Sequence, residues 1–302
     1  MASSGPSNGS AATPRSWVPD EGIGLLTRPI LVTGAIRTGT TWVGEALARS
    51  PELEYVWEPF NPLVRAWPHS RVPHFMTGPY DAQPLVDDIA KSLVELRSRG
   101  RVLGHPESVA RELRRRRQFA SARRADRTLL MKDPLAVLLA RHLEEQFGFR
   151  VVLCVRHPAG FVASCMRLGW DYDFENLLAQ PRLMQRLDPW RNEMEATVGR
   201  HGPMLHRVTL LWRVVYGSLA DGELAPVSPY LVSYEDAVDD PAAAFSRLAA
   251  ALGIQLPPES PPVDATRVDA WRSQLSTDDI VYIRSATERE AARWNYARAA
   301  AW

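Results

Sequence analysis

Two glycines lie where an apolar run gives way to hydroxyl-bearing residues. The run Ile30–Val32 has the length and composition of a buried strand, and Gly34 and Gly39 bound the turn after it. Thr40 then opens an amphipathic segment that extends to about Ser50 and predicts a helix. A strand, a glycine-bearing loop and a helix in this order direct free backbone amides and the positive end of the helix dipole at an anion. The stretch therefore predicts a phosphate-binding loop.

The basic residue of this loop is not where a nucleoside-triphosphate loop has it. The spacing of Gly34 and Gly39 fits the first part of that loop, whose next residue is a lysine that reaches the β- and γ-phosphates. Here that position is Thr40, and the base, Arg37, lies inside the loop. We therefore expect a phosphate cradle that lacks the triphosphate lysine.

Four more polar residues each come after an expected strand. Glu58, Lys132, Arg156 and Tyr234 stand directly behind apolar runs. The runs are Leu53–Trp57, Thr128–Met131, Arg150–Val155 and Tyr230–Ser233. Because helical patterns separate these runs, we expect a mostly parallel sheet, in which ligands bind outside the carboxyl ends of the strands. The four residues and Arg37 should therefore converge on one crevice.

The cations and hydroxyls at this edge suit a departing phosphate. Arg37 and Lys132 supply fixed positive charge, while Thr40 and Thr41 add hydroxyl donors to the loop amides. Such a set stabilises an oxygen whose negative charge grows in a transition state.

A second anion site and a base are expected from the remaining polar residues. Arg156, at a strand end, and Ser164, two turns into the next helix, can hold a phosphate away from the first one. Two separate phosphate sites on one nucleotide argue against ATP as the ligand. Glu58 is the carboxylate at a strand end with an apolar approach and is the candidate general base.

At these residues the chain resembles the sulfotransferases that use 3′-phosphoadenosine 5′-phosphosulfate (PAPS). The 5′-phosphosulfate loop of that family has a basic residue, a small residue and Gly-Thr-Thr, often with Trp. It is matched by Arg37-Thr38-Gly39-Thr40-Thr41-Trp42. The 3′-phosphate element of the family, an arginine after a strand and a serine in the next helix, is matched by Arg156 and Ser164. Its Tyr-Glu-Asp segment, whose tyrosine contacts the adenine, is similar to Tyr234-Glu235-Asp236.

The resemblance is closer to the carbohydrate and tyrosylprotein branches than to the phenol and steroid branch, which uses a histidine base. Glu58 matches the glutamate after the second strand, and Lys132-Asp133-Pro134 matches the Lys-Asp-Pro of the tyrosylprotein branch. Arg37 stands where many members have lysine, a change that the carbohydrate branch also shows. Near the C-terminus, Trp271-Arg272 and Leu275-Ser276 are similar to a segment that covers the cofactor.

The resemblance implies a bacterial, cytoplasmic enzyme that moves a sulfuryl group from PAPS to a hydroxyl and releases 3′,5′-adenosine diphosphate. It implies a sugar, glycolipid or specialised metabolite as the acceptor, with contact to a lipid-linked acceptor left open. A kinase-like phosphotransferase that binds Mg-ATP is one alternative. A non-catalytic nucleotide-binding protein is another, and it would be favoured if Glu58 were buried in a structural ion pair away from the crevice.

Length and composition allow one large α/β domain or a domain with an insertion. The glycine-bearing loop and the alternation of strands and helices favour a single domain of P-loop type, with a central, mostly parallel five-stranded sheet flanked by helices. Residues 1–24, rich in Ser, Gly, Ala and Pro, are expected to be a disordered tail, and residues 25–302 the domain. Segments 63–127 and 170–220 are expected to be insertions on the acceptor side.

Charge and residue spacing exclude several classes of partner. The net charge of +1 gives no reason to expect a nucleic acid, and no segment has the length of a membrane span. No His, Cys and carboxylate cluster has metal-ligand spacing, so metal catalysis is not expected. The arginine-rich segment 111–127 is either a solvated helix face with a loop or a patch for an anionic acceptor or membrane surface.

Overall fold

A computed structural model describes residues 28–63, 72–97, 106–220, 222, 224–259, 261–296 and 302. The predicted tail, residues 1–24, and the domain boundary at residue 25 lie outside the described residues.

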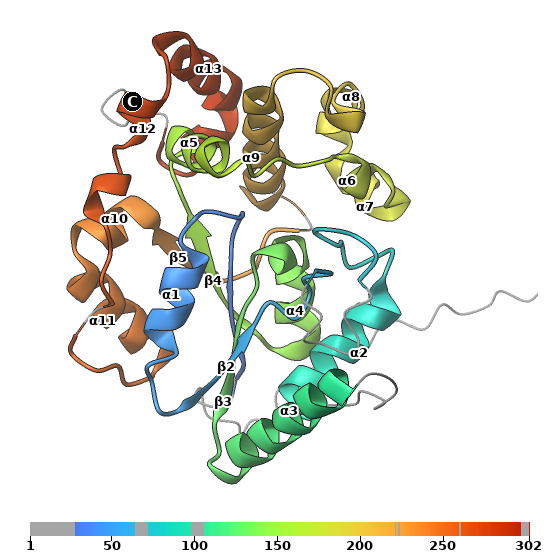
Figure 1. Ribbon diagram of the computed structural model, residues 1–302, viewed down its shortest axis with the longest axis vertical. Helices are drawn as coiled ribbons and strands as arrows, with labels where there is room; N and C mark the ends of the chain where they lie inside the picture. Colours follow the sequence, from blue (N-terminus) through green and yellow to red (C-terminus); the bar gives the residue numbers. More distant parts are fainter. Residues whose placement is uncertain are drawn as a thin grey trace, which may run out of the picture.

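Five parallel strands form the central sheet, in the order β2-β3-β1-β4-β5 (Figure 1). The strands are β1 (Ile30–Thr33), β2 (Leu53–Trp57), β3 (Thr128–Lys132), β4 (Arg150–Val155) and β5 (Tyr230–Ser233). All five predicted strands are therefore confirmed, with ends that differ from the prediction by at most one residue. The sheet is fully parallel, and the predicted α/β class is confirmed.

Alternate side chains of the strands pack into two cores, one on each face of the sheet. Leu31, Met131 and Leu153 belong to the larger core, and Ile30 and Cys154 belong to the smaller one. Helices α2 (Gln83–Val94), α4 (Ala140–Phe147) and α9 (Met204–Ala220) contribute to the larger core, and α1 (Thr40–Leu47) and α11 (Pro241–Leu252) to the smaller. Burial on both faces explains why the strand sequences are nearly continuous apolar runs.

Two expected helices are divided in the structure. The segment Leu135–Phe147 begins as a 3₁₀ helix, Pro134–Leu139, before α4 continues it. The helical segment after Tyr234 consists of α10 (Tyr234–Asp239) and α11, which meet at Asp240. Pro241 cannot donate a backbone hydrogen bond to α10, but it suits the first turn of α11, which the side chain of Asp240 caps.

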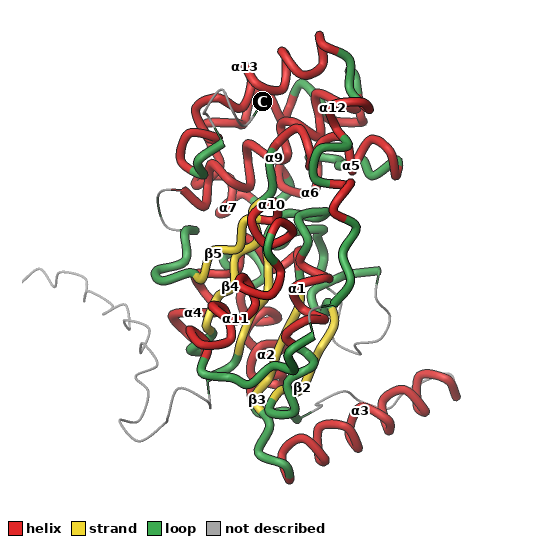
Figure 2. Tube along the Cα trace, turned by 90° about the vertical axis from the view of Figure 1, so that its left-hand side faces the viewer, coloured by secondary structure: helices red, strands yellow, loops and turns green. Residues whose placement is uncertain are grey.

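The arginine-rich segment is a helix, α3 (Pro106–Arg124), that projects beside the sheet in Figure 2. The remaining helices are α5 (Pro158–Leu168), α6 (Glu175–Leu178), α7 (Pro181–Leu187), α8 (Arg191–Glu195), α10, α12 (Trp271–Gln274) and α13 (Thr277–Arg293). Short 3₁₀ turns lie at Asp188–Trp190, Val198–Arg200 and Ala265–Arg267. Among the described helices, none is both long and apolar enough to cross a bilayer.

A helical layer lies beyond the carboxyl ends of the strands. Helices α5, α9, α12 and α13 gather there in both views (Figures 1 and 2). Helix α9 packs against both α5 and α13. Because α5 comes directly after β4, this layer is anchored to the centre of the sheet.

The turn after β3 is fixed by the buried carboxylate of Asp133. Its Oδ1 accepts the backbone N–H of Leu135 at 2.9 Å and its Oδ2 accepts that of Phe60 at 2.7 Å. The first bond caps the 3₁₀ helix, as predicted, and the second connects the turn after β2 to the turn after β3. One side chain thus positions two neighbouring strand ends.

We expect Asp133→Asn to lower the free energy of unfolding by about 1–3 kcal/mol, because an amide has one acceptor oxygen for two buried N–H donors. Urea denaturation at pH 8 measures this loss, since burial raises the pKa of Asp133 to about 7 and the carboxylate is then ionised. Asp240→Asn is the matched control: Asp240 caps α11 at the surface through Oδ1 alone, and asparagine caps equally well. Equal effects of the two substitutions would contradict the role of Asp133.

Candidate functional site

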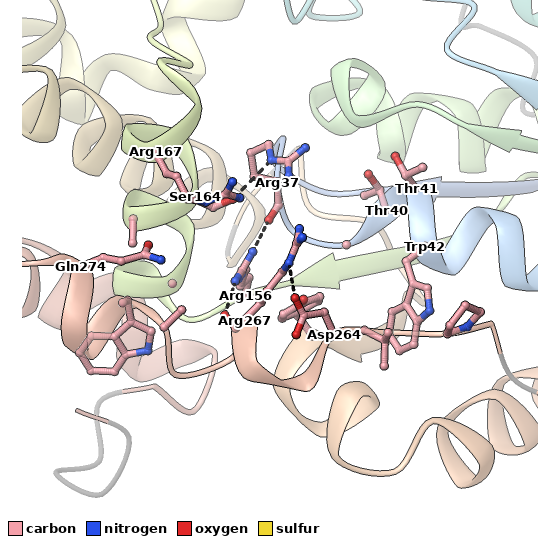
Figure 3. Close-up of a pocket in the computed structure, with 18 of the residues that line it drawn as sticks. Arg37, Thr40, Thr41, Trp42, Arg156, Ser164, Arg167, Asp264, Arg267 and Gln274 are labelled. Carbon is pink, nitrogen blue, oxygen red and sulfur yellow. Dashed lines mark hydrogen bonds and ion pairs between the residues drawn. The ribbon is translucent and has the colours of Figure 1, made fainter.

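A cavity of about 420 Å³ lies at the carboxyl ends of β1, β4 and β5 (Figure 3). Its polar lining comes from the loop after β1, the start of α1, helix α5, the turn after β5 and the segment 262–274. The predicted site residues that line it are Arg37, Gly39, Thr40, Thr41, Trp42, Arg156, Ser164 and Tyr234. Most of the residues expected to bind a nucleotide are thus brought together.

The loop after β1 holds a close, left-handed turn against the ring of Tyr234. Gly39 has φ of 89°, and a Cβ there would lie 2.7 Å from that ring. Arg37 adopts φ of 63° without being glycine, a strained conformation that is found most often at functional sites. The sequence predicts that Thr38 contacts the ligand. In the structure its hydroxyl is buried and donates to the carbonyl of Ala35 at 2.7 Å, so the side chain does not provide this contact. The amides at the start of α1, which begins at Thr40, have no partner within the helix.

Arg156 is a buried cation at the centre of the cavity wall. Its Nη1 donates to the carbonyl oxygen of Arg37 at 3.1 Å, and its Nη2 donates to that of Arg267 at 3.0 Å. The guanidinium lies 4.3 Å from the ring centroid of Tyr234, and its Nε is buried without a partner among the described residues. Burial lowers the pKa of Arg156, although the nearby Tyr234 and Glu235 oppose the shift.

Arg37 joins the two expected phosphate sites. Its Nε lies 3.4 Å from the Oγ of Ser164 on α5, so the loop cation and the helix hydroxyl are in contact rather than apart. Burial also lowers the pKa of Arg37. Within the described part of the chain, neither Arg37 nor Arg156 forms an ion pair with a carboxylate. These two arginines therefore bring positive charge to the cavity that no carboxylate of the described residues pairs with, and this suits an anionic ligand.

Glu58 and Lys132 form a pair of their own and do not line this cavity. Lys132 Nζ lies 2.5 Å from Glu58 Oε1; the lysine side chain is 1% exposed and the glutamate side chain 12%. The lysine stem lies against Gly44 of α1, where a Cβ would come within 2.8 Å of it. Glu58, with φ of 43°, is also strained. Given the strand order, the pair occupies the same sheet edge as the cavity, on the β2–β3 side of β1.

A wall of the cavity comes from a segment to which sequence reasoning assigned no definite site residues. Pro262, Val263, Asp264, Arg267, Ala270, Trp271 and Gln274 all line the cavity, as do Glu45 and Arg167. Trp42 reaches this segment through a hydrogen bond from Nε1 to the carbonyl of Pro261 at 3.3 Å. Of the residues whose sequence suggested a covering segment, Trp271 lines the cavity, whereas Ser276 caps α13. Trp271 is therefore the residue from which the sequence could have predicted this wall of the cavity.

An aromatic cluster around His157 fastens this wall to the sheet. The imidazole stacks on Trp271 at 5.1 Å and 12°, and its centroid lies 5.3 Å from Tyr296 and 4.5 Å from Trp302. Its Nδ1 accepts the N–H of Ala159 and caps α5. Burial, and the nearby positive charge of Arg272, lower the pKa of His157 to about 4.

In the described residues, no group of three His, Cys, Asp or Glu side chains is arranged to hold a metal ion.

The fold and the cavity define an α/β protein with a five-stranded parallel sheet and a cationic ligand pocket at its strand ends. The model of the sulfotransferase family matches residues 29–258, about three quarters of the chain, and the chain belongs to the sulfotransferase family. The cavity wall at 262–274 lies beyond the matched range. A search of curated proteins finds no significant match.

One solved sulfotransferase structure shares the fold, and the chain is similar to others over most of its length. A sulfotransferase domain from the curacin biosynthetic pathway is 18% identical, with a TM-score of 0.52, and the match covers 89% of this chain and 98% of that domain. A sulfotransferase domain from the Synechococcus PCC 7002 olefin synthase is 19% identical, with a TM-score of 0.44, and the match covers 85% of this chain and 94% of that domain. Sulfotransferase STF9 from Mycobacterium avium is 13% identical, with a TM-score of 0.38, and the match covers 88% of this chain and 76% of that one.

The depressed pKa of His157 makes stability depend on pH. Between pH 6.5 and pH 4 the unfolded chain binds a proton that the native state excludes, so stability is lost as the pH falls. We expect this residue to make the free energy of unfolding roughly 2 kcal/mol smaller at pH 5 than at pH 7. In His157→Asn, which keeps an acceptor for Ala159, that part of the pH dependence should disappear in urea denaturation. An unchanged pH dependence would contradict the lowered pKa, because it would show that folding does not shift the pKa of His157.

Proposed function

We propose that this sulfotransferase moves a sulfuryl group from PAPS to a hydroxyl group and acts in a bacterial cytoplasm. The observation that carries the proposal is the meeting of Arg37, Arg156 and Ser164 beside a glycine-bearing loop, with no carboxylate paired to either arginine in the described residues. Two unneutralised cations and a hydroxyl suit a nucleotide with a phosphate at each end of its ribose.

The cavity has the donors that such a nucleotide needs. The loop amides, Thr40, Thr41 and Arg37 would hold the 5′-phosphosulfate at the positive end of α1. Arg156, whose Nε has no described partner, would hold the 3′-phosphate with Ser164. Tyr234 and Trp42, whose rings meet edge to face at 6.4 Å, would flank the adenine.

The Glu58–Lys132 pair would carry the proton and the charge of the reaction. PAPS supplies the sulfuryl group, and the electron pair of the broken sulfur–oxygen bond leaves with 3′,5′-adenosine diphosphate. Glu58 accepts the proton of the acceptor hydroxyl. Because protonation removes the charge of Glu58, Lys132 loses its counterion and becomes free to stabilise the departing oxygen, together with Arg37.

The acceptor expected from the family resemblance is a sugar, glycolipid or specialised metabolite. A kinase-like reaction is less well supported, because Thr40 stands where the triphosphate loop has lysine. One specific observation favours the non-catalytic alternative: Glu58 forms an ion pair with the buried Lys132, and neither residue lines the cavity. Substitution of Glu58 decides between a catalytic and a structural role for this pair.

Recognition of the 3′-phosphate predicts a loss confined to one nucleotide. Ser164→Ala should weaken binding of 3′,5′-adenosine diphosphate about 10-fold or more, since a hydrogen bond to a charged group is lost, and should leave binding of 5′-AMP within 2-fold. Isothermal titration calorimetry measures both ligands. Ser218→Ala, another buried helix serine whose hydroxyl bonds only within its helix, should change neither. If Ser164→Ala weakened the binding of both nucleotides equally, Ser164 would not be a ligand of the 3′-phosphate.

The base role predicts a loss of turnover without a loss of binding. Glu58→Gln should bind 3′,5′-adenosine diphosphate within 2-fold of the native protein and reduce kcat about 100-fold or more. The measurement is the PAPS-dependent mass gain of an acceptor, compared with Glu145→Gln on the exposed face of α4. Full turnover in Glu58→Gln would leave the carboxylate with a structural role only.

A further inference from the structure

A second cavity, of about 280 Å³, lies on the other side of the loop that carries Arg37. Its wall includes Ala35 and Ile36, the two residues that precede Arg37 in the loop. The other lining residues are Leu63, Phe75, Met76, Leu135, Gly169, Trp170, Asp171, Tyr172, Arg200 and Leu211. Aliphatic and aromatic side chains therefore make up most of the surface that a ligand would meet.

Two contacts connect this second cavity to the reacting groups. The guanidinium of Arg37, which lines the first cavity, lies 5.9 Å from the ring centroid of Trp170, which lines the second. Leu63, which also lines the second cavity, donates its N–H to Asn61 at 2.9 Å, and Asn61 donates to Glu58 Oε2 at 2.7 Å. A ligand in the second cavity would thus contact the loop before Arg37 and also Leu63, which Asn61 connects to the carboxylate of Glu58.

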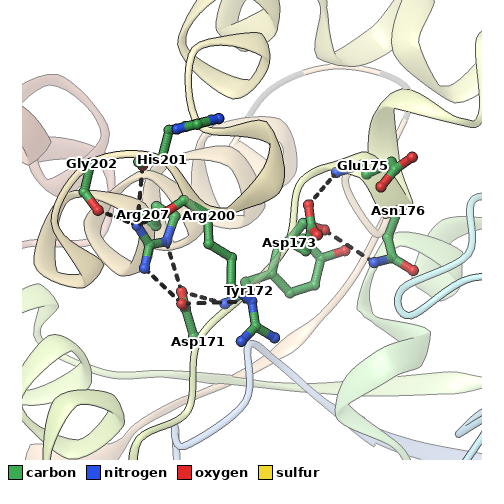
Figure 4. Close-up of polar contacts among 9 residues, drawn as sticks. All are labelled: Asp171, Tyr172, Asp173, Glu175, Asn176, Arg200, His201, Gly202 and Arg207. Carbon is green, nitrogen blue, oxygen red and sulfur yellow. Dashed lines mark hydrogen bonds and ion pairs between the residues drawn. The ribbon is translucent and has the colours of Figure 1, made fainter.

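The polar side chains of Asp171 and Tyr172, at the cavity edge, are already hydrogen-bonded (Figure 4). Asp171 accepts two hydrogen bonds from Arg207, at 3.0 and 2.7 Å, and one from the N–H of Tyr172 at 2.9 Å. The hydroxyl of Tyr172 donates to the carbonyl of Phe75 at 2.7 Å. Arg200, whose Nε lies 3.9 Å from Asp171, has a largely exposed side chain and also lines the cavity. Among the described lining side chains, Arg200 and the indole N–H of Trp170 therefore remain to pair with a polar ligand.

We propose that the second cavity binds the acceptor and selects a flat, apolar molecule of one or two rings that carries the reacting hydroxyl, with Trp170 as the specificity-determining residue. This inference rests on the proposed sulfuryl transfer. A sugar would bury several hydroxyls against a lining that is mostly apolar, and each unpaired group weakens binding. A planar ring instead stacks on Trp170, which is 45% exposed and thus available. The volume exceeds the roughly 150 Å³ that holds one benzene ring.

The test compares 2-naphthol with methyl glucoside as acceptors, using PAPS as the donor. We expect kcat/KM for 2-naphthol to exceed that for methyl glucoside about 100-fold or more, because a mostly apolar lining favours the apolar ring. Trp170→Ala should raise the KM for 2-naphthol about 10-fold or more and leave the KM for PAPS within 2-fold, and Trp170→Phe should restore most of the loss. Tyr282→Ala is the matched control, since Tyr282 is a partly exposed aromatic residue stacked on His206, away from both cavities.

Two results would overturn the proposal. One is a kcat/KM for methyl glucoside equal to or above that for 2-naphthol; the other is a KM for 2-naphthol that Trp170→Ala leaves unchanged. Binding of 2-naphthol, measured by saturation-transfer NMR in the presence of 3′,5′-adenosine diphosphate, separates this inference from the reaction itself. Binding that Trp170→Ala abolishes, without sulfuryl transfer to any acceptor, supports the pocket assignment and contradicts the proposed reaction. Transfer to sugars alone supports the reaction and contradicts the pocket assignment.

Discussion

The buried guanidinium of Arg156 is the constraint on which the ligand pocket depends. A cation removed from water is costly unless the protein supplies compensating groups, and here two carbonyl oxygens, of Arg37 and Arg267, supply dipoles but no full charge. The loop after β1 and the segment before α12 are therefore both held against one side chain. The same side chain is left with a buried donor, Nε, that has no described protein partner. In the function that we propose, a structural role and a binding role thus reside in one residue.

The order of the strands distributes the polar groups along the sheet edge. Glu58 and Lys132 lie at the ends of β2 and β3, Arg37 comes after β1, and Arg156 stands between β4 and α5. Asp133 connects the first two of these turns, so the ion pair is held by the backbone at both strand ends. The left-handed conformations of Arg37 and Glu58 show that the chain adopts unfavourable geometry at two of these positions.

Local patterns were sufficient to predict the parallel sheet and most of the cavity. The five strands are short apolar runs bounded by polar residues, and a parallel sheet brings the residues after each strand to one edge. The break at Asp240 and Pro241 was also readable in principle, from the proline. The pairing of Glu58 with Lys132 could not be predicted from the sequence. Residues at the ends of adjacent strands can contact each other or a shared ligand, and the sequence does not distinguish these two arrangements. The wall at 262–274 was not predictable for another reason: it is irregular, and its position depends on packing against His157 and Arg156.

Because of the aromatic cluster around His157, the residues that form the two cavities are completed at different times during synthesis. All described residues that line the second cavity precede residue 212, so its wall is complete once the helical layer through α9 exists. The first cavity also needs Trp271, and the cluster that secures Trp271 includes Tyr296 and Trp302. A ribosome would therefore synthesise every described lining residue of the second cavity before the residues that complete the wall of the first cavity.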